Sequence, residues 1–271
     1  MLFSASWYPE SSLDKWCLPG AEIIIEPSMT SIYQKMVDSG IFLTAHSPMQ
    51  VAIGSKKSGV RFLSTDLICK HLEILKQLQP GKPAHIVVHA ANFSDRSAEE
   101  VWEVQRRTLW SLWYKMKERH LLDVALICIE NLGKISQVGS LDDIIKLCSL
   151  TDNFIPCIDF GHLYGRSLGK VLNSKEEFES VFQKLYSSLP RWKVDNMHIH
   201  FSKLLYTDKG EKKHTNFHDK SAGPKPALFI RALSSLPESF NPVIVCESSE
   251  PYRDGFQLMK NFESHKKSVL K

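Results

Sequence analysis

Short apolar, β-branched runs recur along the chain and alternate with longer amphipathic stretches. Several runs are apolar on both faces, as strands of a parallel sheet covered by helices must be. The runs predict eight strands, over residues 2–5, 22–26, 41–46, 84–90, 124–130, 154–159, 196–202 and 242–247. The amphipathic stretches predict helices over residues 29–39, 61–79, 95–120, 140–150, 174–188, 225–236 and 252–266.

This alternation matches a (β/α)8 TIM barrel, which typically takes about 250 residues. A doubly wound open sheet is the competing α/β fold, but no G-x-G-x-x-G or Walker loop follows any predicted strand. The chain has no internal repeat, low-complexity tract or linker. We therefore predict a single TIM-barrel domain over residues 1–271. The longest stretch predicted to be irregular, 203–224, follows a strand, on the side where barrels carry their sites.

Composition excludes several classes of protein. The chain is 43% hydrophobic and 24% charged, which is ordinary for a soluble globular protein. Its net charge of +4 does not by itself identify a nucleic-acid binder. The six cysteines form no CxxC pair, which fits reduced thiols in a cytosol. No apolar run is long enough to span a membrane and the start resembles no signal peptide, so we expect a cytoplasmic protein with no membrane partner, and a monomer.

Seven of the eight predicted strands have an acidic or imidazole side chain at or near their carboxyl end. An apolar residue would be sufficient for packing at these positions. The acidic and imidazole residues are Glu26, His46, His89, Glu130, Asp159 with the nearby His162, His198 with His200, and Glu247. Carboxylates and imidazoles together suit Zn²⁺, Mn²⁺ or Fe²⁺. Residues two apart on a strand share a face, so the pairs Cys128/Glu130, Cys157/Asp159 and His198/His200 can all point into the barrel. We predict a metal centre whose catalytic carboxylates are Glu130, Asp159 and Glu247.

Basic residues follow the strand ends on the same side of the predicted barrel. Arg166, Lys203, Lys212 and Lys213 are the candidates to bind substrate there. Such residues would normally belong to a solvated loop, but over a metal centre they can meet phosphate.

Seven short motifs carry a family resemblance. They are HSP (46–48), VVHAAN (87–92), CIENLG (128–133), CIDFGH (157–162), HIHFSK (198–203), KKH (212–214) and VCES (245–248). They resemble the ligand motifs of the endonuclease IV family, a branch of the xylose-isomerase-like barrels, and they occur in that family's order across residues 1–250.

The resemblance implies a zinc site of two or three ions that hydrolyses DNA on the 5′ side of abasic sites, with Mn²⁺ or Fe²⁺ as alternative metals. The ligands it implies are His46, His89 and Glu130 for the first ion, Glu130, Asp159, His198 and Glu247 for the second, and His162 and His214 for the third. DNA containing an abasic or otherwise damaged site is then the expected partner.

The sequence departs from the family pattern at two positions. The family's third site takes an Asp two residues before its second His; here that position is Lys212, and Glu211 is one residue away. Where the family carries a Tyr that wedges into DNA, the stretch HSPMQ offers Met49. Apolar side chains such as Met can wedge between bases, so Met49 is also a candidate to bind substrate.

The alternative function is a sugar or sugar-phosphate isomerase or epimerase with a single divalent metal. The set Glu130, Asp159, His198 and Glu247 resembles the metal ligands of such enzymes. In them a carboxylate or a lysine moves the proton, and Glu26 and Lys203 would suit that step. His46 and His89 discriminate, because both are expected at a multinuclear site and superfluous at a mononuclear one. A non-catalytic barrel with a structural or lost metal is a third reading.

Overall fold

The computed structural model describes residues 2–5, 27–40, 42–48 and 50–269. The predicted strand 22–26 with Glu26, and also Met49, lie outside the described residues. The chain consists of two compact units, one formed by Met1–Trp7 with Glu130–Lys271 and the other by Tyr8–Ile129. The single domain predicted from the sequence stays a prediction.

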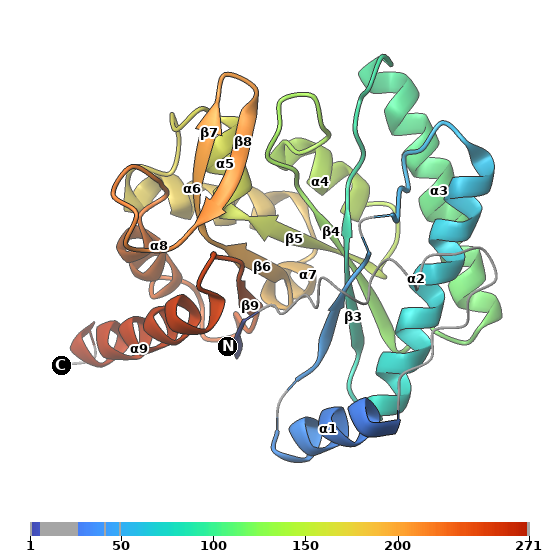
Figure 1. Cartoon of the computed structure of the whole chain (residues 1–271), viewed down its shortest axis with the longest axis horizontal. Coiled ribbons are helices and arrows are strands. Elements are labelled where there is room, and N and C mark those ends of the chain that lie inside the picture. The colour runs from blue at the N-terminus through green and yellow to red at the C-terminus, as the bar shows by residue number, and fades with distance from the viewer. Residues whose placement is uncertain (1, 6–26, 41, 49, 270–271) are drawn as a thin grey trace. The chain divides into compact units, whose positions relative to one another are not determined.

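The unit Tyr8–Ile129 has parallel strands with helices packed against them (Figure 1). Strand β2 (Thr44–His46) pairs in parallel with β3 (Ala84–His89), and β4 (Ala125–Glu130), whose last residue begins the other unit, lies beside β3. The helices are α1 (Pro27–Asp38), α2 (Ser58–Leu78) and α3 (Ala98–Glu118). Helix α2 packs on both α3 and β3, and it buries Ile68, Leu72 and Leu75.

The unit that contains Glu130–Lys271 has its own parallel strands, in the order β1 (Leu2–Ala5), β9 (Val243–Cys246), β6 (His198–Phe201) and β5 (Phe154–Asp159). Its helices are α4 (Leu141–Cys148), α5 (Phe160–Arg166), α6 (Lys175–Ser188), α7 (Arg191–Asp195), α8 (Pro226–Leu233) and α9 (Pro251–Val269). Phe160, Phe178, Phe182, Phe201 and Phe229 form a fully buried aromatic core. This core supports the strand ends where the polar residues lie.

The stretch 203–224 is not irregular throughout, so that prediction was wrong. It contains an antiparallel hairpin of β7 (Lys203–Thr207) and β8 (Gly210–Thr215), shown at the upper left of Figure 1. Gly210 occupies the turn with a φ of 92°, a backbone conformation that favours glycine. Glu211 N–H donates to the Gly133 carbonyl (2.9 Å), and Ile135 N–H donates to the Lys209 carbonyl (3.1 Å). These bonds to the segment after β4 stabilise a hairpin whose second strand, GEKKHT, shows no apolar alternation.

The other predicted strands that fall on described residues are all present, and the pairs β1–β9, β2–β3, β5–β6 and β6–β9 are parallel. Within the described residues, no helix combines the length and the apolar character that a membrane span requires.

Candidate metal centre

The register of the parallel strands arranges the polar side chains in two layers. Cys157 on β5 pairs with His198 on β6, and two residues further along, Asp159 pairs with His200. Because residues two apart share a face of a strand, these four side chains point to the same side. Asp159 and His200 therefore form the layer nearer the carboxyl ends of the strands, and Cys157 and His198 form the layer beneath it.

The outer layer belongs to a group that we call the carboxylate set: Glu130, Asp159, His200 and Glu247. Each member offers one ligand atom, and these atoms lie within 4.8 Å of one another. His200 Nδ1 lies 3.0 Å from Glu130 Oε1 and 3.3 Å from Glu247 Oε1. Two ligand atoms on one tetrahedral zinc ion are about 3.3 Å apart, given bonds of about 2.05 Å. The spacing thus fits a shared divalent ion.

The imidazole of the carboxylate set is His200, whereas the ligand set predicted from the sequence names His198, whose role as a ligand stays a prediction. The structure places His198 beside Cys157, with 3.8 Å between His198 Nδ1 and Cys157 Sγ. Alternation along the strand puts both histidines on one face. The pairing of Asp159 with His200 brings His200 level with the acids.

Two further histidines form a second group with Asp159, which we call the imidazole set: Asp159, His162 and His214. Asp159 caps α5 by accepting the His162 N–H at Oδ1 (2.7 Å), which holds His162 in the first turn. His162 Nδ1 lies 2.8 Å from the Asn131 carbonyl, and His214 Nδ1 lies 3.1 Å from the Glu247 carbonyl. A carbonyl oxygen only accepts, so each Nδ1 carries the proton and each Nε2 is left for another partner. The two Nε2 atoms face each other at 3.2 Å, close to the spacing of two ligands on one ion.

Glu211 lies beside His162 and His214, although Lys212 occupies the sequence position at which the endonuclease IV family has an acid. Glu211 Oε2 lies 3.5 Å from His162 Nε2, and Oε1 lies 3.8 Å from His214 Nε2. The pairing of β7 with β8 skips Lys212, because Leu205 pairs with Lys213 and Tyr206 with Glu211. This bulge turns Glu211 to the face that carries His214 and leaves Lys212 exposed.

Gly133 provides the space that Glu211 occupies. A Cβ at position 133 would lie 2.7 Å from both Cβ and Oε2 of Glu211 and 3.0 Å from His162 Cδ2. Any side chain at position 133 would therefore displace the Glu211 carboxylate from His162 and His214.

The charges of the two sets indicate a need for cations. Asp159 is fully buried, and its Oδ2 accepts no hydrogen bond from the residues that the structure describes. Burial raises the pKa of Asp159. Burial would lower the pKa of His162, but the carboxylates of Asp159, Glu130 and Glu211 outweigh it and raise that pKa to about 9. The residues therefore fit bound divalent ions, because without them these imidazoles must hold protons to balance the acids.

Asn131 holds Asp159 and His162 in position through hydrogen bonds. Its side chain donates to the Asp159 carbonyl (3.0 Å) and accepts from the Asp159 N–H (2.8 Å), while its own carbonyl accepts from His162. One buried amide thus fixes both Asp159 and His162. Asn131 was absent from the sequence-based set, although its place directly after Glu130 in the CIENLG motif is the signal that could have found it.

The predicted ligands His46 and His89 lie together in the unit Tyr8–Ile129. They come from the ends of β2 and β3, and their rings meet edge to face with centroids 4.7 Å apart. Adjacent parallel strands bring them together, as the sequence predicts. Their role as ligands stays a prediction.

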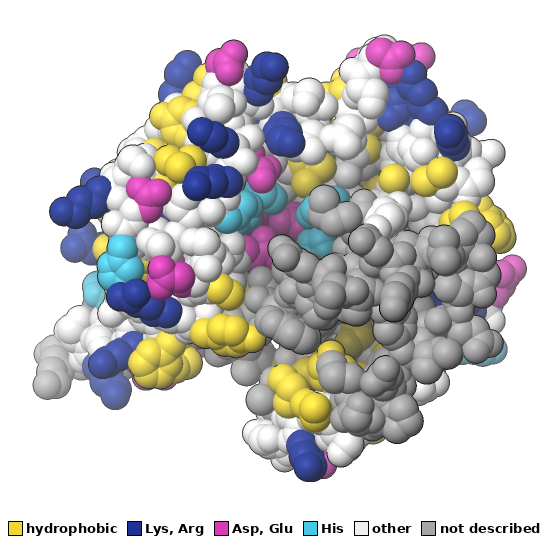
Figure 2. Space-filling view, in the orientation of Figure 1, with side chains coloured by type: hydrophobic (Ala, Val, Ile, Leu, Met, Phe, Trp, Pro, Cys, Tyr) yellow, Lys and Arg dark blue, Asp and Glu magenta, His cyan; other side chains and the backbone are white. Residues whose placement is uncertain are grey.

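The predicted substrate-binding residues differ in exposure. Lys212 and Lys213 are exposed on β8, and Figure 2 shows basic side chains gathered over the hairpin near histidine and acidic side chains. Lys203 is buried, and its ammonium group donates to the carbonyls of Phe217 and Asp219. Arg166 donates to the carbonyls of Lys134 and Gln137. The two hairpin lysines are thus the better placed to bind a substrate.

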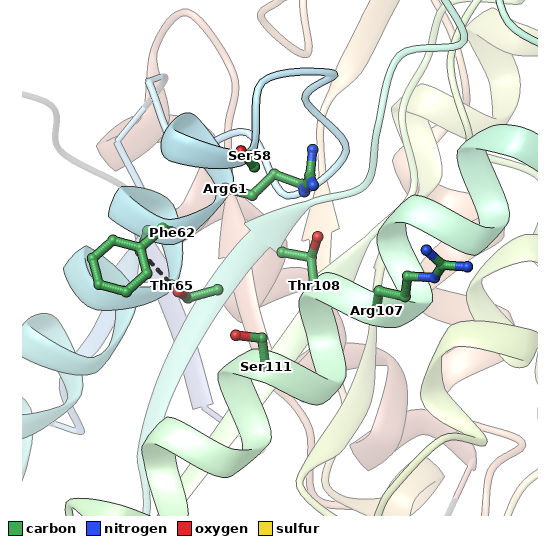
Figure 3. A pocket seen from close by; sticks show the side chains of 7 residues that line it. All are labelled: Ser58, Arg61, Phe62, Thr65, Arg107, Thr108 and Ser111. Carbon is green, nitrogen blue, oxygen red and sulfur yellow. Dashed lines mark hydrogen bonds between the residues drawn. The ribbon is translucent and has the colours of Figure 1, made fainter.

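A separate shallow cleft of about 180 Å³ lies between α2 and α3 in the unit Tyr8–Ile129 (Figure 3). Hydroxyl side chains line it together with Phe62, Arg61 and Arg107. Arg61 donates to the carbonyls of Ser55 and Lys56, and Arg107 donates to Glu103. The lining residues include no acid or imidazole, so we assign this cleft no chemistry.

The chain belongs to the xylose isomerase-like TIM barrel family, whose model matches residues 22–262. The predicted barrel class is therefore confirmed. An uncharacterized protein of Methanocaldococcus jannaschii is 28% identical over 220 residues, which cover 81% of this chain and 76% of that protein.

Solved structures show the same fold. A D-tagatose 3-epimerase-like protein is 17% identical with a TM-score of 0.64, covering 91% of this chain and 86% of that one. Endonuclease IV from Thermus thermophilus is 15% identical with a TM-score of 0.63, covering 93% of this chain and 85% of that one. The similar structures thus include both an endonuclease and an epimerase-like protein, so the choice between these two functions depends on the site.

Proposed function

We propose that the protein is a metal-dependent phosphodiesterase that cleaves DNA on the 5′ side of abasic sites. One observation carries the proposal: two ligand sets, the carboxylate set and the imidazole set, share Asp159 within one compact unit. A single-metal isomerase needs only the first of these. The paired Nε2 atoms of His162 and His214, with Glu211 beside them, support a second ion.

The residues of the two ligand sets would have distinct roles. The carboxylate set would hold one ion and the imidazole set with Glu211 another, and Asp159 would link the two. Closely spaced divalent ions lower the pKa of a bound water, orient a phosphate and stabilise the leaving oxygen. Asn131 and the Glu247 carbonyl fix the imidazole tautomers, so the ligand nitrogens are in place before substrate binds.

We propose Zn²⁺ as the resident ion, with Mn²⁺ or Fe²⁺ as alternatives, because the ligands combine imidazole nitrogen with carboxylate oxygen. His46 and His89 are proposed as additional ligands. The two imidazoles are adjacent, at the ends of neighbouring strands, and are not needed as ligands of a single metal ion. Replacing both with Gln should reduce the number of ions bound per chain, measured by elemental analysis.

An isomerase or epimerase is the alternative function, because the carboxylate set alone is sufficient for one ion. That reaction also needs a base or acid to move a proton between carbons. Lys203, the lysine considered for that step, has its ammonium group on the carbonyls of Phe217 and Asp219. This contact argues against Lys203 as the group that moves the proton, whereas Glu26, the other residue considered for that step, lies outside the described residues.

The test is cleavage of a labelled duplex that contains one abasic analogue, with Zn²⁺ or Mn²⁺ supplied and an undamaged duplex as control. We expect a single cut 5′ of the lesion and no cut in the control. Turnover of a ketose phosphate, with no cut under either metal, would overturn the proposal in favour of the isomerase.

Charge reversal on the hairpin should weaken the binding of DNA. We expect Lys212→Glu with Lys213→Glu to raise KM for the abasic duplex several-fold with a smaller effect on kcat, because phosphate contacts contribute equally to substrate and transition state. The dependence of binding on salt, measured between 50 and 200 mM, should become shallower. Charge reversal at the exposed Lys266 and Lys267 of α9 is the matched control. An unchanged KM and salt dependence would remove the hairpin from the binding surface.

A further inference from the structure

Beneath the carboxylate set lies a thiol that the proposed reaction does not use. Cys157 is fully buried and shares the inner layer with His198. Its Sγ lies 3.8 Å from His198 Nδ1. Ligand atoms of Cys157, His198 and His200 all lie within 4.8 Å of one another.

The spacing is close to that of ligands on one metal ion. Tetrahedral zinc with bonds of about 2.3 Å to sulfur and about 2.05 Å to nitrogen places the two ligand atoms about 3.6 Å apart. The rings of His198 and His200 meet edge to face at 5.1 Å between centroids, so both imidazoles border the same small volume. On β9, by contrast, the positions in register with His198 and His200 are Val243 and Val245. The polar inner layer therefore does not extend onto β9.

We propose that Cys157, His198 and His200 form a thiolate-containing binding site for one thiophilic divalent ion, beneath the carboxylate set. His200 belongs to both groups. An ion of borderline softness such as Zn²⁺ or Co²⁺ accepts the sulfur ligand as well as the oxygen ligands of the carboxylate set, whereas a hard ion such as Mn²⁺ takes the oxygen ligands alone. The inner site thus makes the centre select among metals. This inference rests on the proposed metal centre but not on the reaction that it catalyses.

The Cys157 thiol becomes a metal ligand only when an ion binds and the thiol loses its proton. Cys157 is fully buried, and a thiol binds a metal ion as the thiolate. An incoming divalent ion displaces the thiol proton to solvent and forms the metal–sulfur bond, with no change of oxidation state.

Co²⁺ is the probe that reports the sulfur ligand directly. We expect metal-depleted protein titrated with Co²⁺ to show a sulfur-to-cobalt charge-transfer band in the near ultraviolet. X-ray absorption at the cobalt edge should show one sulfur neighbour. Cys157→Ser and Cys157→Ala should lose the band, still bind Co²⁺ through the carboxylate set, and lose at least tenfold in their preference for Co²⁺ over Mn²⁺. Cys148→Ser is the matched control, because Cys148 is also fully buried but belongs to no ligand group among the described residues.

Co²⁺ bound to the wild type without a sulfur neighbour overturns this inference and leaves the proposed function standing. A band that persists in both Cys157 variants also overturns it. If the wild type binds no Co²⁺ at all, both the inner site and the metal-dependent function fail. The absorption measurement on the wild type decides the matter even if the variants do not fold.

Discussion

Glu130→Gln should reduce kcat for the abasic duplex by at least about 1,000-fold, the scale of losing a group that stabilises the transition state directly. Glu130 Oε1 lies 3.0 Å from His200 Nδ1 and 3.5 Å from His162 Nδ1, so one carboxylate borders both ligand sets. The amide keeps the shape but removes the negative charge that holds an ion. The measurement is single-turnover cleavage together with metal content by elemental analysis.

Glu263→Gln is the matched control, because Glu263 is exposed on α9. It should leave both activity and metal content unchanged. His214→Ala should cost less than Glu130→Gln, since Glu211 and His162 remain to hold the second ion. Equal and total loss in both variants would show that the two ions act as one unit. Full activity in Glu130→Gln would remove Glu130 from the centre.

Chelation with EDTA should abolish cleavage and lower the melting temperature by several degrees without unfolding the protein at 25 °C. The metal stabilises the folded state because it offsets repulsion among the acids of the two sets. The buried aromatic core around Phe160 and Phe229 is independent of the metal, so the fold persists. Scanning calorimetry with and without EDTA, followed by readdition of Zn²⁺, measures both effects. Complete unfolding at 25 °C would contradict a preformed centre.

The affinity for the metal should also depend on pH. The pKa of His162 is about 9, because the surrounding carboxylates outweigh burial, so below that pH an ion must displace a proton from this imidazole. Affinity should therefore rise with pH towards about 9, and binding should release protons. Calorimetric titrations in two buffers of different ionisation enthalpy count those protons.

Much of the centre could be predicted from the sequence because strand ends are local features. The apolar runs located β5, β6 and β9, and the polar residues that end them were visible as breaks in those runs. Alternation along a strand further showed that His198 and His200 share a face. Which of them meets the acids depends on how β6 pairs with β5, a register that no local pattern contains.

The sequence by itself determined the class of fold, the parallel strands and the residue types that gather at their carboxyl ends, because hydrophobic periodicity and side-chain chemistry act locally. Only the tertiary structure decided that His200 joins the carboxylate set, that Asn131 fixes Asp159 and His162, and that Cys157 lies beneath them. Only the tertiary structure also revealed that a bulge in β8 turns Glu211 toward His162 and His214. These arrangements depend on register, bulges and long-range hydrogen bonds, which join residues far apart in the chain and are set by the packing of the whole unit.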